Sequence, residues 1–175
     1  MGTKGLVLVN TGPGKGKTTA AVGTAIRALG QGFKVAFLQF IKSQETGESR
    51  FMTEFEGANP GRLYYKRLGL GLIHGNPTDG DRAKAAEAMA EAEKLAAADY
   101  NLLVLDEICV ALSLGLIQTE KVVRLIQNRK PGLNLILTGR GCPEEIAELA
   151  DTVTEMTVVK HAYQNGVPAR QGIEF

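Results

Sequence analysis

The sequence predicts an α/β domain in which a mainly parallel β-sheet is flanked by helices. Short apolar, β-branched runs alternate along the chain with longer segments of helical periodicity, and this alternation is typical of parallel sheets. The runs are apolar at nearly every position, as strands buried on both faces are. A length of 175 residues suits one hydrophobic core, and no repeat or linker divides the chain, so we expect residues 1–175 to form a single domain.

The first half of the chain contains three expected strands and one clear helix. Residues 6–9 form a β-branched run that predicts the first strand, and helical periodicity then extends over residues 17–29 with Gly30 as the stop. The apolar stripe of this helix is expected to consist of Val22, Ile26 and Leu29. Residues 35–40 predict the second strand and residues 62–66 the third.

The second half continues the alternation. Residues 83–98 are rich in alanine, a strong helix former, and Met89 and Leu95 are the large apolar side chains there. We therefore expect this helix to pack closely through its small side chains. Two more helices are expected at residues 119–128, with Thr119 as the N-cap, and at residues 143–150. The remaining strands are expected at residues 102–105, 133–138 and 153–159.

Two stretches are expected to be loops. Residues 42–50 are polar, and residues 67–82 are glycine-rich and long for a connection. Long irregular loops in compact domains are more often functional than incidental.

Composition and charge exclude several classes of partner. The formal net charge is +1, so no global field draws in nucleic acid or an anionic membrane, and we expect neither as a partner. No apolar run approaches the ~20 residues that span a bilayer. The only apolar run near the N-terminus is residues 6–9, shorter than the ~7–15-residue core of a secretory signal, which predicts a cytoplasmic protein. Cys109 and Cys142 form neither a disulfide framework nor a CxxC metal motif and are interpreted as reduced thiols.

A glycine-rich loop follows the first strand and opens the first helix, which is the context that a P-loop requires. Side chains would obstruct backbone N–H groups that curl around a phosphate, whereas a lysine and a threonine at the helix start can meet phosphate oxygens and Mg²⁺. The residues expected to bind nucleotide are Gly12, Pro13, Gly14, Lys15, Gly16, Lys17, Thr18 and Thr19. The strict pattern has glycine at the position of Thr11, and Gly12 could serve one step later. The alternative is a glycine-rich turn that only links strand to helix.

The matching acidic strand lies about 90 residues further on. Residues 102–105 are apolar and end in Asp106 and Glu107, where a carboxylate can reach the shell of a Mg²⁺ ion. The expected metal ligands are Thr18, Asp106 and Glu107, and it stays open which carboxylate meets the metal directly. Arg140 follows the fifth expected strand, where it can neutralise phosphate or stand exposed in a turn.

Several segments taken together resemble one family. They are residues 11–21, 39–42, 105–107, 138–142, 150–156, 159–163 and 172–175, which read TGPGKGKTTAA, QFIK, LDE, TGRGC, ADTVTEM, VKHAY and GIEF. In this order, and with the extra Lys15 in the P-loop, the chain is similar to the ATP:corrinoid adenosyltransferases of the P-loop type, over nearly its whole length.

The resemblance implies a fold and a reaction. The fold would be a RecA-like P-loop NTPase domain, usually a homodimer. The 5′-deoxyadenosyl group of ATP would move to the Co(I) centre of a corrinoid, such as cob(I)yrinic acid a,c-diamide or cob(I)alamin, in cobalamin biosynthesis or salvage. Triphosphate would be released intact, and a flavin or flavoprotein would supply the electrons. ATP would lie with its γ-phosphate in the loop and its 5′ carbon toward the corrinoid.

The family also implies roles for particular residues. Lys15, Lys17 and Glu107 would act in catalysis, with the two lysines and Mg²⁺ stabilising charge on the departing triphosphate. No general base is needed, because Co(I) is itself a strong nucleophile. His161 would contact nucleotide or corrinoid, or would cap the segment that follows it.

Relatives carry a Phe and a Trp in the loop after the third strand, thought to displace an axial ligand of the corrinoid. Here Leu70 and Leu72 match them, and His74 in the same loop is a candidate cobalt ligand. The two leucines either exclude the axial ligand, belong to an enzyme that handles corrinoid differently, or pin the loop to the core.

Two other functions remain open at this point. A P-loop kinase or ATPase would cut the γ-phosphate and yield ADP or phosphate. A non-enzymatic carrier would bind an adenosylated corrinoid and deliver it to a partner.

Overall fold

The strands of the computed structural model, which describes residues 4–73 and 75–175, form one six-stranded sheet in the order β3-β2-β4-β5-β1-β6. The pairing is parallel throughout, as the apolar runs predicted. The strands are β1 (Val7–Thr11), β2 (Val35–Gln39), β3 (Leu63–Arg67), β4 (Leu102–Asp106), β5 (Asn134–Thr138) and β6 (Thr152–Glu155).

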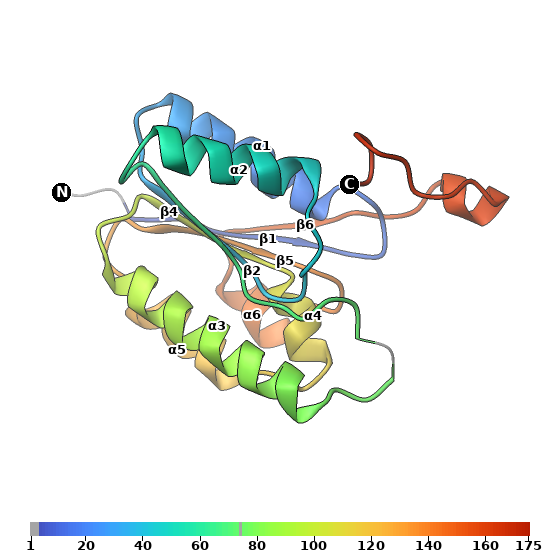
Figure 1. The fold of residues 1–175 in the computed structure, drawn as a ribbon. Helices are drawn as coiled ribbons and strands as arrows, with labels where there is room; N and C mark the ends of the chain where they lie inside the picture. Colours follow the sequence, from blue (N-terminus) through green and yellow to red (C-terminus); the bar gives the residue numbers. More distant parts are fainter. Residues whose placement is uncertain (1–3, 74) are drawn as a thin grey trace.

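Helices cover both faces of this sheet (Figure 1). One face carries α1 (Lys17–Gly30) and α2 (Gly47–Ala58). The other carries α3 (Asp79–Ala97), α4 (Ile108–Ser113), α5 (Thr119–Asn128) and α6 (Glu144–Leu149). A short 3-10 helix, η1 (Ala162–Asn165), lies in the segment after β6. Each face has its own buried apolar cluster, so the α/β prediction is confirmed.

Within the described ranges, no helix combines the length and the apolar composition needed to cross a membrane.

The alanine-rich helix packs as predicted. Its buried face consists of Ala85, Ala88, Met89, Ala92, Leu95 and Ala96. It begins at Asp79 rather than at residue 83, because Thr78 and Asp81 cap its start reciprocally: each backbone N–H donates to the other's side chain, at 2.9 and 3.2 Å.

The predicted stripe of α1 is wrong in part, because Leu29 is buried and Val22 packs against the same apolar cluster, whereas Ile26 does not. Ile26 is 46% exposed, and the buried face is formed by Lys17, Ala21, Ala25 and Leu29. The fully buried alanines lie in the apolar cluster between this helix and the sheet, which favours small side chains at the contact and leaves the larger Ile26 outside. Gly30 belongs to the helix, and Gly32 adopts the left-handed conformation after it, at φ +85°.

The polar stretch at residues 42–50 is not only a loop, because α2 begins inside it at Gly47. The Thr46 backbone N–H donates to Ser49 Oγ at 2.9 Å and thereby helps to set the start of the helix. A second missed helix is α4, which follows directly on the acidic strand end. The predicted cap of α5 is also wrong. Thr119 is the first residue of this helix, and Gln118 is the cap.

The last strand is shorter than predicted. β6 ends at Glu155, all four of its residues are exposed, and it pairs with β1 at the edge of the sheet. Residue 156 leaves the sheet because its carbonyl accepts from Gly14 N–H at 2.6 Å. The segment at residues 156–175 then runs past the carboxyl edge of the sheet, where the loops after the other strands converge (Figure 1).

Candidate active site

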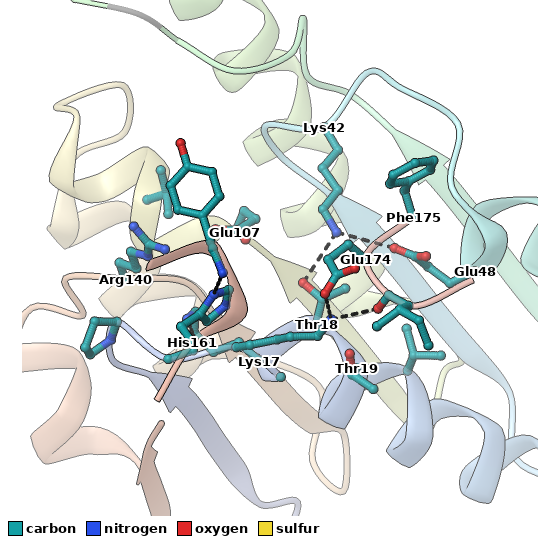
Figure 2. Close-up of a pocket in the computed structure, with 18 of the residues that line it drawn as sticks. Lys17, Thr18, Thr19, Lys42, Glu48, Glu107, Arg140, His161, Glu174 and Phe175 are labelled. Atoms are coloured by element: carbon teal, nitrogen blue, oxygen red, sulfur yellow. Dashed lines mark hydrogen bonds and ion pairs between the residues drawn. The ribbon is translucent and has the colours of Figure 1, made fainter. Parts of the chain in front are cut away.

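A cavity of about 960 Å³ opens at the carboxyl edge of the sheet (Figure 2). The loop after β1 forms one wall, and the segment at residues 158–175 contributes another. Protein pockets for small molecules range over ~300–1,000 Å³, so this cavity is large enough for a sizeable ligand. Among the predicted residues, it brings together Pro13, Gly14, Lys15, Gly16, Lys17, Thr18, Thr19, Leu72, Glu107 and Arg140.

The loop between β1 and α1 needs its glycines for two reasons. Gly12 and Gly16 have φ values of +94° and +115°, which side-chain-bearing residues rarely adopt. A Cβ atom on Gly12 or on Gly14 would lie 2.6 Å from the backbone oxygen of Met156. Glycine is therefore required by the close approach of residue 156 as well as by the left-handed backbone of the loop.

The Lys17 side chain is folded into this loop. Its Nζ donates to the carbonyl oxygens of Gly12 and Gly14 at 2.7 and 2.6 Å. Burial lowers the pKa of the Lys17 ammonium, with Glu107 acting in the opposite direction. The cation is thus held at the centre of the loop, where a phosphate oxygen could replace a carbonyl as its acceptor.

Asp106 lies beside the first turn of α1. The carboxylate is 0% exposed, and its Oδ1 accepts from Thr18 Oγ1 at 2.9 Å and from Thr138 Oγ1 at 2.7 Å. The Thr138 hydroxyl in turn accepts from the Glu107 backbone N–H at 2.9 Å. Residues from α1, β4 and β5 therefore meet at one point.

These oxygens fit a magnesium site. The Lys42 ammonium lies 3.5 Å from Thr18 Oγ1 and 3.7 Å from Asp106 Oδ2 (Figure 2). A positive charge is therefore already bound next to these two oxygens. Among the described residues, no three His, Cys, Asp or Glu side chains form a metal cluster. Mg²⁺ commonly uses one or two protein oxygens and completes its shell with phosphate and water, and the pair Thr18 and Asp106 suits that mode.

Glu107 begins α4 in an unusual conformation. Its φ of +63° is the only positive value at a non-glycine residue in the part of the chain that the structure describes. Such strain is found at functional sites when the surroundings enforce it. Burial, and then the charge of Asp106, raise the pKa of the Glu107 carboxyl.

The extra P-loop lysine contacts the far wall of the pocket. Lys15 Nζ donates to the carbonyl oxygen of Ile173 at 2.8 Å and to Glu174 Oε1 at 2.7 Å. The Arg170 backbone N–H holds the other oxygen of the same carboxylate at 2.8 Å. Hydrogen bonding from Lys15 lowers the pKa of Glu174, which is therefore an anion beside the glycine-rich loop at neutral pH.

The predicted residues do not all reach the cavity. Gly12 and Asp106 lie behind its wall, where each supports a lining residue. Leu72 lines the cavity and is 84% exposed, whereas Leu70 lines a separate small cleft with Ile41 and Asp81. The two leucines are thus separated. His74 lies outside the described residues.

Several lining residues were not among the predicted site residues. Lys42 and Glu48 form an ion pair of 3.4 Å above Thr18. In the sequence both lie in the polar stretch at residues 42–50, and Lys42 also ends the QFIK segment. The lining also includes Val110, Val158, His161, Tyr163, Gln164 and residues 172–175. His161 Nδ1 accepts from the Tyr163 backbone N–H at 3.2 Å and caps η1, and the same residue lines the cavity, so its contact with a ligand stays a prediction.

A family model described as ATP:corrinoid adenosyltransferase BtuR/CobO/CobP matches residues 3–175. The corrinoid adenosyltransferase of Pseudomonas aeruginosa is 41% identical, over 98% of this chain and 84% of that protein. The corrinoid adenosyltransferase of Escherichia coli K12 is 37% identical, over 98% of this chain and 86% of that protein. The corrinoid adenosyltransferase CobA of Salmonella typhimurium shows the same identity and the same coverage.

Solved structures with a similar fold are more distant in sequence. The RadB recombinase superposes with a TM-score of 0.55 at 17% identity, over 90% of this chain and 77% of that one. A KaiC-like protein from Pyrococcus horikoshii gives a TM-score of 0.53 at 19% identity, over 91% of this chain and 76% of that one. These likenesses concern the fold alone, and they confirm the RecA-like P-loop architecture.

Proposed function

This chain belongs to the ATP:corrinoid adenosyltransferase family, and on that premise we propose how its pocket carries out the reaction. The enzyme transfers the 5′-deoxyadenosyl group of ATP to the Co(I) centre of a corrinoid and releases triphosphate, in cobalamin biosynthesis or salvage. The substrate is cob(I)yrinic acid a,c-diamide or cob(I)alamin in our proposal.

The triphosphate of ATP binds at the loop between β1 and α1. The observation that carries this proposal is the cavity itself, in which the backbone of residues 13–16, Lys15 and Lys17 share one wall. Backbone N–H groups and the N-terminus of α1 favour anions at that wall. Thr19 and Arg140 complete the set of groups that face the phosphates.

Mg²⁺ is held by Thr18 and Asp106, with Glu107 reaching it directly or through water. The supporting observation is the position of the Lys42 ammonium against Thr18 and Asp106. When bound, the ion neutralises negative charge on the triphosphate oxygens.

In the transfer step, the cobalt–carbon bond forms as the C5′–O bond breaks, and the electron pair of that bond leaves with the triphosphate. The protein supplies no general base, because Co(I) is the nucleophile. Lys15 and Lys17 stabilise the charge that develops on the leaving group, and the loop keeps ATP in line for attack. The apolar outer lining at Leu72, Val110 and Val158 faces the corrinoid.

A product assay tests this function. Wild-type protein is incubated with ATP, Mg²⁺ and chemically reduced cob(I)alamin, and the products are separated with and without light. We expect a light-sensitive cobalt–carbon product together with stoichiometric triphosphate. ADP formation without corrinoid would instead indicate a γ-phosphate-cleaving enzyme, and corrinoid binding without turnover would indicate a carrier.

Four further properties belong to the same proposal. Residues 1–175 act as one domain, and two copies form a homodimer, for which the exposed outer strand β6 offers an edge within the described residues. A flavin or flavoprotein reduces the corrinoid, and the reaction takes place in the cytoplasm. The family resemblance supports the dimer and the reductant.

A further inference from the structure

A chain of buried hydrogen bonds leads from β3 to the proposed metal ligands. Tyr65 Oη donates to Gln39 Oε1 at 2.6 Å, and Gln39 Nε2 donates to Asp106 Oδ2 at 3.0 Å. Gln39 is 1% exposed and Tyr65 is also buried. Sheet register explains the contact: Gln39 is paired with Asp106 across β2 and β4, and Tyr65 is paired with Phe37, two residues before Gln39.

Asp106 determines which group donates and which accepts in each hydrogen bond of this series. Both Asp106 oxygens accept hydrogen bonds, and the Gln39 NH₂ group donates to Oδ2, which leaves the Gln39 carbonyl oxygen to accept from Tyr65. Tyr65 must then be the donor. Burial raises the pKa of the Tyr65 phenol, which keeps that proton in place.

The same logic extends to Thr18. Its hydroxyl has one proton, and donating it to Asp106 Oδ1 leaves the oxygen lone pairs free for a cation. If the carboxylate rotated, Thr18 would lose the acceptor that sets the direction of its hydroxyl. Gln39 occupies the other carboxylate oxygen and so prevents that rotation.

We propose that Gln39 and Tyr65 are positioning residues that orient Asp106, and through it the Thr18 hydroxyl, for the Mg²⁺ that accompanies ATP. This inference rests on the proposed function, because it assumes the metal site at Thr18 and Asp106. Neither residue lines the cavity, so neither touches the nucleotide, and both act through Asp106.

The neighbouring residue on β3 provides a matched control. Tyr64 lies next to Tyr65 but points to the opposite face of the sheet, where its hydroxyl hydrogen-bonds to Glu91 of α3. Tyr64→Phe and Tyr65→Phe therefore each remove one phenol hydrogen bond from the same strand. A merely structural role predicts the same kind of effect for both.

The experiment measures ATP binding by isothermal titration calorimetry without corrinoid, with saturating Mg²⁺ and with EDTA. The ratio of the two Kd values is the Mg²⁺ enhancement. We expect Tyr65→Phe to lower the enhancement by up to about tenfold, the upper end of the range for one hydrogen bond between neutral groups, while Tyr64→Phe leaves it unchanged. Thermal denaturation of both variants confirms that they are folded.

Gln39→Met is a second variant. It removes the amide that links Tyr65 to Asp106 and keeps a side chain of similar length. Since Tyr65 acts only through Gln39, the double variant is expected to match Gln39→Met alone. Additive losses, or a Tyr65→Phe protein that keeps the wild-type enhancement, overturn the positioning role. A wild-type protein that forms adenosylated corrinoid yet binds ATP without Mg²⁺ enhancement overturns the positioning role and spares the function. A wild-type protein that forms no such product overturns the function itself.

Discussion

Removing the charge of Lys17 is the sharpest test of the phosphate loop. Lys17→Met keeps much of the aliphatic chain and deletes the ammonium that donates to the Gly12 and Gly14 carbonyls at 2.7 and 2.6 Å. In the proposed complex this ammonium turns to triphosphate oxygens. Because it already has two carbonyl acceptors in the free protein, the net gain on binding is closer to one charge-assisted hydrogen bond than to two.

One such bond contributes about 1.5–3 kcal/mol, which corresponds to about a 10- to 100-fold change in Kd. We therefore expect Lys17→Met to weaken inorganic tripolyphosphate binding by this factor, measured by calorimetry. Turnover is expected to fall further, since charge on the leaving group grows in the transition state. Thermal denaturation checks that the variant is folded.

Lys34→Met is the matched control. Lys34 precedes β2 at the opposite edge of the sheet, where it pairs with Asp99 at 2.8 Å. The Lys34→Met variant should bind tripolyphosphate as tightly as the wild-type protein does. A Lys17→Met protein with wild-type affinity for tripolyphosphate would show that the triphosphate does not bind at this loop.

Three further outcomes are expected. Glu107→Gln should raise the Tm of the nucleotide-free protein at pH 7. The pKa of this carboxyl in the folded protein lies above its ordinary value of 4.5, so above the folded pKa the ionised side chain destabilises the folded state. The difference should vanish below pH 4.5, where both states are protonated, and an equal gain at every pH would contradict the shift. Glu174→Gln should tighten tripolyphosphate binding at low salt by releasing Lys15, with a smaller gain at high salt; weaker binding would mean that this carboxylate helps to hold the phosphate. Leu72→Ala should raise the corrinoid KM without changing ATP affinity, whereas Leu70→Ala should not, and equal effects would reject the separation of the two leucines.

The place and conformation of the glycine-rich loop could be predicted from the sequence because all of its residues lie within a short consecutive stretch. The glycines, Lys17 and Thr18 sit between an apolar strand and a helix, and that context defines their geometry. Asp106 was also predictable, since its strand ends in a carboxylate and parallel strands end at one edge.

The residues that surround the loop were harder to predict from the sequence. The stripe of α1 was predicted from apolar periodicity, but the distance between helix and sheet selected alanines instead of Ile26. Lys42 belonged to a segment that resembles the family, but only the structure placed its ammonium beside Thr18 and Asp106. The pairing of Lys15 with Glu174 joins positions 159 residues apart, and no local pattern encodes such a contact.

By itself, the sequence determined the alternation of strands and helices, the glycine-rich loop before α1 and the acidic strand end, because each depends on neighbours within a few residues. The family membership follows from the order of those segments. Only the tertiary structure decided which distant side chains reach the loop, since the strand order β3-β2-β4-β5-β1-β6 differs from the chain order. Sheet register then decided that Tyr65, Gln39 and Asp106 share one face, because side chains alternate along each strand and partners in register point the same way.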